Sequence, residues 1–369
     1  MRSTIFSKVL MCVGFALMAV SCNNDDDKVL VPQSKDLQAV DQIFFEQIAK
    51  TNAVTKKNEV WSGFALDAFP KYILYSEKDK SGHRGFLLDP TKKMSGAVAI
   101  DPLKAKGLKN VYRYDAAGDK LKSKLTKDND TFVFFLGIEN VNHYAQVYNT
   151  EKMALKDGNS IQFLVHEVFH LHQEDWATSS KPLQDMDNYP LTIELLPLQM
   201  MHEQIAKNLP KEKDLAKIDE YLAMYVAIRS KEIELDPSAQ KLVKNMANWQ
   251  ENFEGTAKYV EKMVLKEAFG NEDSVFGTMD SKDILHRETL RVHYAWGIWY
   301  DTGAAVAYML KKKGINVEAQ LKAGVSLYAL ASKALKLSST EKEQMLQKAK
   351  QKYDWPALVQ ESKRLLALK

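Results

Sequence analysis

The residues of this chain best suited to chemistry are His166, Glu167 and His170, which follow one another as H-E-x-x-H. Residues four apart share one face of a helix, so the two imidazoles can reach one metal ion. Glu167 stands beside them, where a carboxylate can hold a water molecule that the ion activates. The neighbouring residues are apolar, which predicts a buried helix over residues 161–174. Burying two imidazoles and a carboxylate without partners would be costly, and a bound metal ion removes that cost.

A catalytic zinc site needs a third protein ligand, because zinc there commonly takes three side chains and a water molecule. No histidine follows His170 at the short spacing that completes some zinc sites, so a glutamate on a later helix is expected. Spacing alone favours Glu194 over the more distant Glu203 and Glu254.

The segment that contains Glu254 has a motif of its own. An aromatic residue, Phe253, precedes Glu254-Gly255-Thr256-Ala257, and this E-G-x-A pattern resembles the second metal motif of the gluzincin zinc metallopeptidases. In that family the glutamate is the third ligand, so the resemblance implies Glu254 in that role. It also implies that Gly255 and Ala257 let their helix pack closely on the helix of the two histidines.

The same resemblance implies a role for several other residues. The segment between the two motifs, residues 175–250, would be a helical insertion, and Glu194 and Glu203 would be surface residues or would support the ligands. Lys258 departs from the family, in which some members carry an acid at that place to orient a ligand histidine. Glu261 could take over that supporting role.

A third segment, Tyr300-Asp301-Thr302-Gly303, resembles the Y-x-x-G segment of gluzincin aminopeptidases. The family's tyrosine hydroxyl stabilises the oxyanion that forms when the scissile carbonyl becomes tetrahedral, which implies that role for Tyr300. His293 and Tyr294 are alternative donors. The competing interpretation is a core aromatic residue on an apolar helix.

The sequence Gly137-Ile138-Glu139-Asn140 is similar to the G-x-M-E-N strand that captures a substrate's amino terminus. If that role holds, Glu139 makes the protein an aminopeptidase; the competing interpretation is a strand end followed by a turn. His143, close by, could line a cleft. His172 faces away from His170 and is expected to be supporting or structural, and the histidines expected at the surface are His83, His202 and His286.

Residues 1–21 predict a signal peptide, with a basic start and a short apolar core over 9–20. Small residues before Cys22 resemble a bacterial lipobox, so Cys22 is expected to carry lipid. An acidic stretch follows, and residues 22–35 look like the flexible tether of Bacteroides-type surface lipoproteins. The expected location is therefore the outer membrane, exposed at the surface. A plain secretory signal and a generic solvated linker are the competing interpretations.

The spacing of apolar residues along the rest of the chain predicts a predominantly helical α+β fold. A helix is expected over 36–50, and short apolar or alternating runs predict a small mixed sheet with strands near residues 72–74, 85–88, 97–100 and 131–136. Later helices are expected over residues 191–208, 213–234, 238–268, 284–313 and 317–335, with a last one starting at a capping box on Ser338. The prediction is a mixed subdomain with an edge strand over 36–150, packed on a helical, zincin-like domain over 151–369.

Composition excludes several classes of protein. With 45% hydrophobic and 27% charged residues, the chain is neither disordered nor collagen-like, and a net charge of +3 does not suit a nucleic-acid binder. The two cysteines, Cys12 and Cys22, lie at the N-terminus, so a metal site in the folded body must be built from histidine and carboxylate.

Together these features predict a zinc-dependent peptidase of the cell surface with one zinc ion. The ion would be held by His166, His170 and Glu254, Glu167 would be the general base, and Tyr300 the oxyanion donor. An edge strand would pair with an extended peptide or protein substrate. Two alternatives stay open: a non-catalytic zinc-containing surface protein that binds peptides or glycans, and a hydrolase of non-peptide amides.

Overall fold

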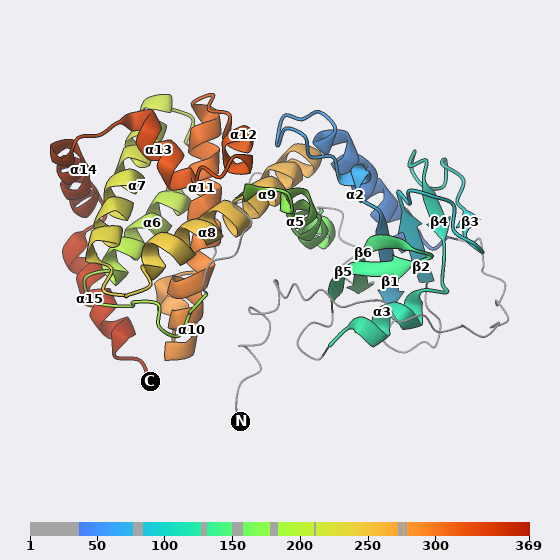
Figure 1. Cartoon of the computed structure of the whole chain (residues 1–369), viewed down its shortest axis with the longest axis horizontal. Helices are drawn as coiled ribbons and strands as arrows, with labels where there is room; N and C mark the ends of the chain where they lie inside the picture. The colour runs from blue at the N-terminus through green and yellow to red at the C-terminus, as the bar shows by residue number, and fades with distance from the viewer. Residues whose placement is uncertain are drawn as a thin grey trace. The chain divides into compact units, whose positions relative to one another are not determined.

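The computed structural model describes residues 37–76, 84–126, 131–149, 158–177, 184–209, 212–271, 276 and 279–369. The chain divides into two compact units, Met1–Glu59 with Gly63–Leu164 and Val60–Ser62 with Val165–Lys369 (Figure 1). Among these described residues, helices predominate beside one mixed sheet, which confirms the predicted α+β class. The predicted signal peptide, Cys22 and tether lie outside the described residues. Within the described residues, no helix has the length and apolar character needed to cross a membrane.

The first unit is built on a sheet in which six strands are described, in the order β3-β4-β2-β1-β6-β5. Strands β1 and β6 are parallel and the other neighbours are antiparallel, so the sheet is mixed as predicted. The strands are β1 (Lys71–Ser76), β2 (Arg84–Leu88), β3 (Val98–Ala99), β4 (Val111–Arg113), β5 (Phe132–Ile138) and β6 (Val141–Asn149).

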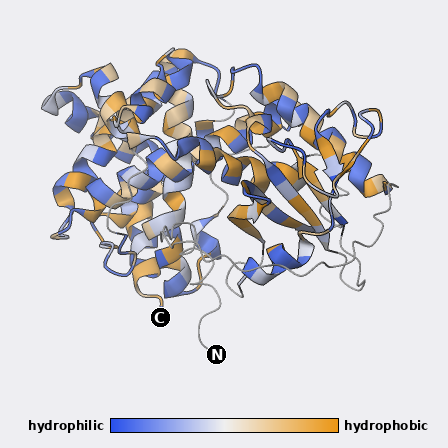
Figure 2. Ribbon diagram, turned by 45° about the vertical axis from the view of Figure 1, so that its right-hand side comes forward, coloured by the Kyte–Doolittle hydropathy of each residue, from blue (hydrophilic) through white to orange (hydrophobic). Residues whose placement is uncertain are grey.

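Both faces of this sheet are covered by apolar side chains. On one face, Phe44 of α2 (Ala39–Thr55) contacts Tyr75 and Tyr148, with ring centroids 5.9 and 5.5 Å apart. On the other face, Leu121 of α3 (Gly118–Lys124) belongs to a buried cluster with residues of β1, β2, β5 and β6. The apolar character of the strands is visible in Figure 2.

Strands β1, β2, β3 and β5 confirm the predicted strands, but β4 and β6 were missed. The long strand β6 carries His143 and Gln146, which are buried although polar, so its sequence lacks the apolar alternation of a strand. The turn between β5 and β6 consists of Glu139 and Asn140, both with positive φ (44° and 62°). This confirms the interpretation of these residues as a strand end followed by a turn.

The second unit is helical. Helix α5 (Asn159–Gln173), predicted over 161–174, begins in the first unit and continues in the second. The helices that follow are α6 (Leu196–Asn208), α7 (Leu215–Leu235), α8 (Asn248–Gln250), α9 (Thr256–Phe269), α10 (Arg287–Val292), α11 (Ile298–Lys312), α12 (Val317–Lys322), α13 (Leu327–Leu335), α14 (Ser339–Lys352) and α15 (Trp355–Leu366). Helices α6 and α7, in the segment expected as an insertion, pack against each other and against α11 in the core of this unit.

Two long predicted helices contain π-helical segments. The helix expected over 238–268 includes Val243–Ala247 (η4) and Glu251–Gly255 (η5), and the one expected over 284–313 includes His293–Gly297 (η7). A π-helical segment inserts a residue into the α-helical winding and redirects the side chains around it, and such segments often lie at functional sites.

The helix expected over 317–335 is wrong in its continuity. It is two helices, α12 and α13, because the chain turns at Gly324, whose φ of 88° is incompatible with helical winding. The capping box at the start of α14 is confirmed: Ser338 Oγ accepts from the Glu341 N–H at 3.2 Å, and the Glu341 carboxylate accepts from the Ser338 N–H at 2.8 Å.

Candidate metal centre

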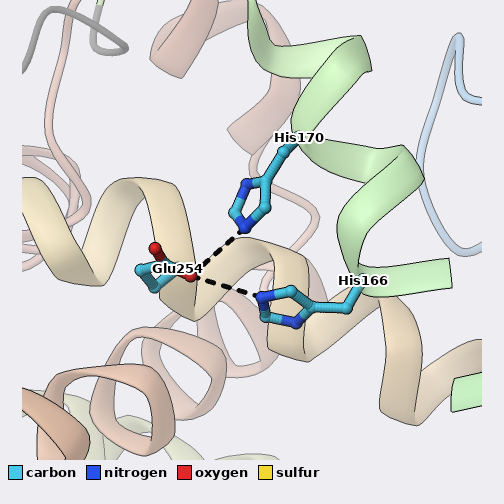
Figure 3. Close-up of side chains that lie close together, drawn as sticks. All are labelled: His166, His170 and Glu254. Carbon is cyan, nitrogen blue, oxygen red and sulfur yellow. Dashed lines mark hydrogen bonds and ion pairs between the residues drawn. The ribbon is translucent and has the colours of Figure 1, made fainter. Parts of the chain in front are cut away.

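Three buried side chains of the second unit converge on one point. The Nε2 atoms of His166 and His170 each lie 3.2 Å from Oε2 of Glu254. Figure 3 shows both imidazoles directed from α5 toward this carboxylate on the neighbouring helix. One ligand atom from each residue lies within 4.8 Å of the other two. Of the three glutamates considered as third ligand, the structure therefore brings Glu254 to the histidines.

Helix α5 places both imidazoles on one side because they stand four residues apart. Its other side is anchored in the core by Leu164, Val165 and Val168, which are fully buried. The two imidazole centroids are 4.8 Å apart with their planes nearly perpendicular. This arrangement leaves one nitrogen of each ring directed at the same place.

A second carboxylate fixes the orientation of His166. Nδ1 of His166 lies 2.9 Å from Oε2 of Glu261, so this nitrogen donates and Nε2 is the one that faces Glu254. Burial alone would lower the pKa of His166, but Glu254 and Glu261 outweigh it and raise this pKa to about 10. Burial would raise the pKa of Glu254, yet the two histidines hold it well below its ordinary value. Glu261 thus occupies the supporting position expected for it.

An amide holds the other imidazole. Nδ1 of His170 donates to Oε1 of Gln173 at 2.7 Å, because an amide oxygen can only accept. The Gln173 amide nitrogen then donates to the Phe253 carbonyl at 2.9 Å and to Thr256 Oγ1 at 2.8 Å. Gln173 therefore links α5 to the helix that carries Glu254. Sequence reasoning missed this residue; its place one turn beyond His170, on the same helix face, was the available signal.

The residues present fit a divalent ion. Two imidazole nitrogens and one carboxylate oxygen are the donor set of many catalytic zinc sites. Two ligands about 2.1 Å from one tetrahedral ion lie about 3.4 Å apart, and both nitrogen–oxygen distances to Glu254 are 3.2 Å. Moreover, Oε1 of Glu254 and Oε2 of Glu167 are buried without a hydrogen-bond partner among the described residues. Orphaned buried carboxylate oxygens are costly, and a cation compensates for them.

Glu167 lies beside the ligands rather than among them. Its side chain is 3% exposed. Burial raises the pKa of Glu167 to about 7, and the nearby charges of His166 and His170 only partly oppose this rise. A carboxyl group whose pKa lies near neutrality suits a proton acceptor that must later return the proton.

Tyr300 comes to the site from α11. Its ring lies nearly parallel to the imidazole of His166, at an angle of 10° with centroids 6.0 Å apart. Its neighbour Asp301 forms an ion pair with Lys258 at 2.6 Å. The lysine that departs from the family motif therefore links α9 to α11, and the acid that contacts His166 is Glu261, further along α9.

Gly255 allows close packing of two helices, but the helix that packs against it is α11 and not the histidine helix α5. A Cβ atom at Gly255 would lie 2.5 Å from the Cα of Gly303, and one at Gly303 would lie 2.4 Å from the carbonyl oxygen of Glu251. The small residues therefore let η5 pack on α11, whereas the resemblance implied close packing on the histidine helix.

The other candidates are placed elsewhere. Glu194 is exposed. Glu203 is buried and bonded to Lys207 and to the Tyr294 hydroxyl, at 2.5 and 3.0 Å. Tyr294 is therefore occupied as a donor, and His293 lies next to this same carboxylate, 3.7 Å from it. Tyr294 and His293, the alternative oxyanion donors, are therefore engaged with Glu203 and not with the metal ligands.

The remaining histidines are structural or exposed. The prediction of a surface position is wrong for His202, which is 1% exposed and whose Nε2 pairs with Glu232 at 3.1 Å, so that its burial is compensated. It is confirmed for His286, and His83 lies outside the described residues. His172 packs against aromatic rings of its own helix region, and His143 is buried in the first unit with Nδ1 donating to a β6 carbonyl.

Comparisons of the chain with models of protein families, with curated proteins and with solved structures found no match.

Proposed function

We propose that this protein is a zinc-dependent peptidase of the gluzincin type with a zincin-like catalytic domain. The main support for this proposal is the buried carboxylate of Glu167, whose Oε2 atom has no hydrogen-bond partner among the described residues, beside a buried cluster of two imidazoles and one carboxylate. A site that only stored a metal ion would not need this additional carboxyl group beside its three ligands. The resemblance of the E-G-x-A and Y-x-x-G segments to the family supports the same assignment.

The residues divide the work of amide hydrolysis. His166, His170 and Glu254 would hold the ion, which when bound lowers the pKa of water and polarises a carbonyl group. Glu167 accepts the proton of the attacking water and passes it to the leaving amine, a transfer for which a pKa of about 7 is well matched. Tyr300, whose ring stacks beside His166, donates a hydrogen bond from its hydroxyl group to the oxyanion. Glu261 and Gln173 keep both imidazoles in the required orientation.

The substrate we propose is an extended peptide or protein segment. Strand β5 stands at one end of the described sheet order and pairs there with β6, so its other edge can accept a peptide strand. The amino-terminus role of Glu139 is less supported, because its carboxylate already accepts the Ser95 N–H at 2.7 Å. We further propose that Cys22 carries lipid and anchors the protein at the outer surface of the outer membrane.

The test is hydrolysis of a quenched fluorescent peptide library by the zinc-loaded protein. Glu167→Gln should keep the zinc content and lose activity about 10²–10⁴-fold, the usual contribution of a general base. Glu174→Gln, which changes an exposed glutamate near the end of the same helical segment, is the matched control and should cleave like the wild type. A Glu167→Gln variant that binds zinc and cleaves at the wild-type rate would contradict the proposal.

The same assay separates the non-catalytic alternative. A zinc-containing binding protein would leave every peptide intact while retaining the ion. If the wild type leaves this library intact but cleaves non-peptide amides in a second assay, the reaction class stands and the substrate class is wrong.

A further inference from the structure

A fully buried arginine, Arg229, pairs with Glu251, which stands three residues before the proposed ligand Glu254. The guanidinium of Arg229 on α7 donates to Glu232 Oε2 at 2.8 Å and, through its other nitrogen, to Glu251 Oε1. Its charged end also lies over the ring of Trp299, 4.4 Å from the centroid. A buried charge of this kind is costly to leave unpaired, so the arginine strongly constrains where the two carboxylates can lie.

Glu251 receives more contacts than charge pairing requires. The Tyr225 hydroxyl donates to its Oε2 at 2.7 Å, and Thr302 Oγ1 donates to its Oε1 at 2.9 Å. Both carboxylate oxygens are therefore held, from α7 on one side and α11 on the other. The Glu251 side chain is also 0% exposed, so these hydrogen bonds and the surrounding core fix its position.

Glu251 is also the first residue of η5, the π-helical segment that carries Glu254. In an α-helix, residues three apart point within about 60° of each other. A π-helix, closed by i→i+5 hydrogen bonds, turns less per residue and separates them further. This winding allows Glu251 to reach α7 and α11 while Glu254 reaches the histidines of α5.

We propose that Tyr225, Arg229 and Thr302 are positioning residues for the metal site. By holding the Glu251 carboxylate they fix the rotation of η5 about its axis, and that rotation sets the Glu254 carboxylate opposite Nε2 of His166 and His170. The contact between η5 and α11 at Gly255 and Gly303 adds the second constraint, because it fixes the distance between the helices. This inference rests on the metal site of the proposed function but not on peptide cleavage.

The test uses variants that remove hydroxyl groups without removing charge. Tyr225→Phe combined with Thr302→Val takes both hydroxyl donors from Glu251 and leaves its pair with Arg229. Tyr294→Phe is the matched control, because it takes one hydroxyl donor from a different buried carboxylate, Glu203. For each protein we would measure zinc affinity by competition with a chelating dye, the visible spectrum with Co²⁺, and the unfolding temperature of the metal-free form.

We expect the Tyr225→Phe, Thr302→Val double variant to bind zinc about tenfold more weakly than the wild type and to show shifted Co²⁺ absorption bands. Tyr294→Phe should lower the unfolding temperature yet stay within about twofold of the wild-type affinity. Thr302→Ser, which restores a hydroxyl, should recover most of the affinity when combined with Tyr225→Phe. Wild-type affinity and spectrum in the double variant, or an equal loss in Tyr294→Phe, would overturn the positioning role. A wild type that binds neither ion would instead overturn the proposed function, and with it this inference.

Discussion

Glu261 accepts a hydrogen bond from Nδ1 of His166 at 2.9 Å, on the opposite side of the ring from Glu254. One helix, running from η5 into α9, thus supplies both carboxylates. Glu254 faces Nε2 of His166, and Glu261 orients the ring through Nδ1. Carboxylate–histidine pairs of this kind raise the basicity of a ligand histidine and fix its tautomer.

Loss of this support should weaken metal binding. Glu261→Gln leaves an acceptor of the same shape but removes its charge, and we expect zinc affinity to fall about 10–100-fold. Competition with a chelating dye measures the change. Glu267→Gln, on an exposed position of the same helix, should leave the affinity unaltered. Equal affinities for both variants would mean that Glu261 does not support the ligand.

Gln173 permits two changes with different expected outcomes. Gln173→Leu removes the acceptor for His170 and both donors to the Glu254 helix, so zinc affinity should fall about 10–100-fold. Gln173→Glu keeps the acceptor but loses the donors, so it should bind zinc more tightly than Gln173→Leu while remaining weaker than wild type. An unchanged affinity in Gln173→Leu would show that the orientation of His170 is set by other contacts.

Metal binding should release a proton, because the carboxylates raise the pKa of His166 to about 10 against the lowering effect of burial. Below that pH the ring must lose its proton before it can coordinate, so apparent affinity should rise with pH, by up to about tenfold per unit from this group. Calorimetric titration at pH 8 in buffers of different ionisation heats counts the protons, and we expect about one from His166. Glu261→Gln should reduce that number. Binding without proton release would contradict the protonated, doubly hydrogen-bonded imidazole.

The same raised pKa has a consequence for the metal-free protein. A histidine with a folded pKa of about 10 and an unfolded one of about 6.5 stabilises the fold fully below pH 6.5. That contribution is lost as the pH rises toward 10. Urea unfolding of the metal-free protein across this range should therefore show a decline that His166→Gln removes.

Because η5 and α11 lie so close together, we expect position 303 to tolerate only glycine without loss of stability. Gly303→Ala would place Cβ 2.4 Å from the Glu251 carbonyl oxygen, and such overpacking costs about 1–3 kcal/mol. Gly297→Ala is the control, since the nearest atom to its Cβ would be 3.5 Å away, an ordinary contact distance. Denaturant unfolding should show a large loss of stability for the first change and little for the second. Similar stabilities would mean that the two helices can separate without cost.

The sequence predicted the parts of this molecule that depend on local spacing. The H-E-x-x-H helix, the capping box of α14 and four of the six described strands follow from patterns within a few residues of each other. Glu254 could not be chosen by spacing, which favoured Glu194; the family motif pointed to it, and the structure brings it to the histidines.

What the sequence did not predict depends on partners that are distant in the chain. Gln173 and Glu251 look like ordinary polar residues until tertiary packing brings them to Phe253 and Arg229. His202 was expected at the surface because nothing in its own segment shows that Glu232 lies beside it. The π-helical winding of η5 is likewise not encoded in local helical periodicity, and it occurs where η5 packs on α11.

We expect His166, His170 and Glu254 to hold one zinc ion. Anomalous diffraction at the zinc absorption edge, from crystals grown with zinc, locates that ion. A single strong peak should lie about 2 Å from Nε2 of both histidines and from a carboxylate oxygen of Glu254. A peak coordinated by Glu194 in place of Glu254, or no peak between the two histidines, would contradict this expectation.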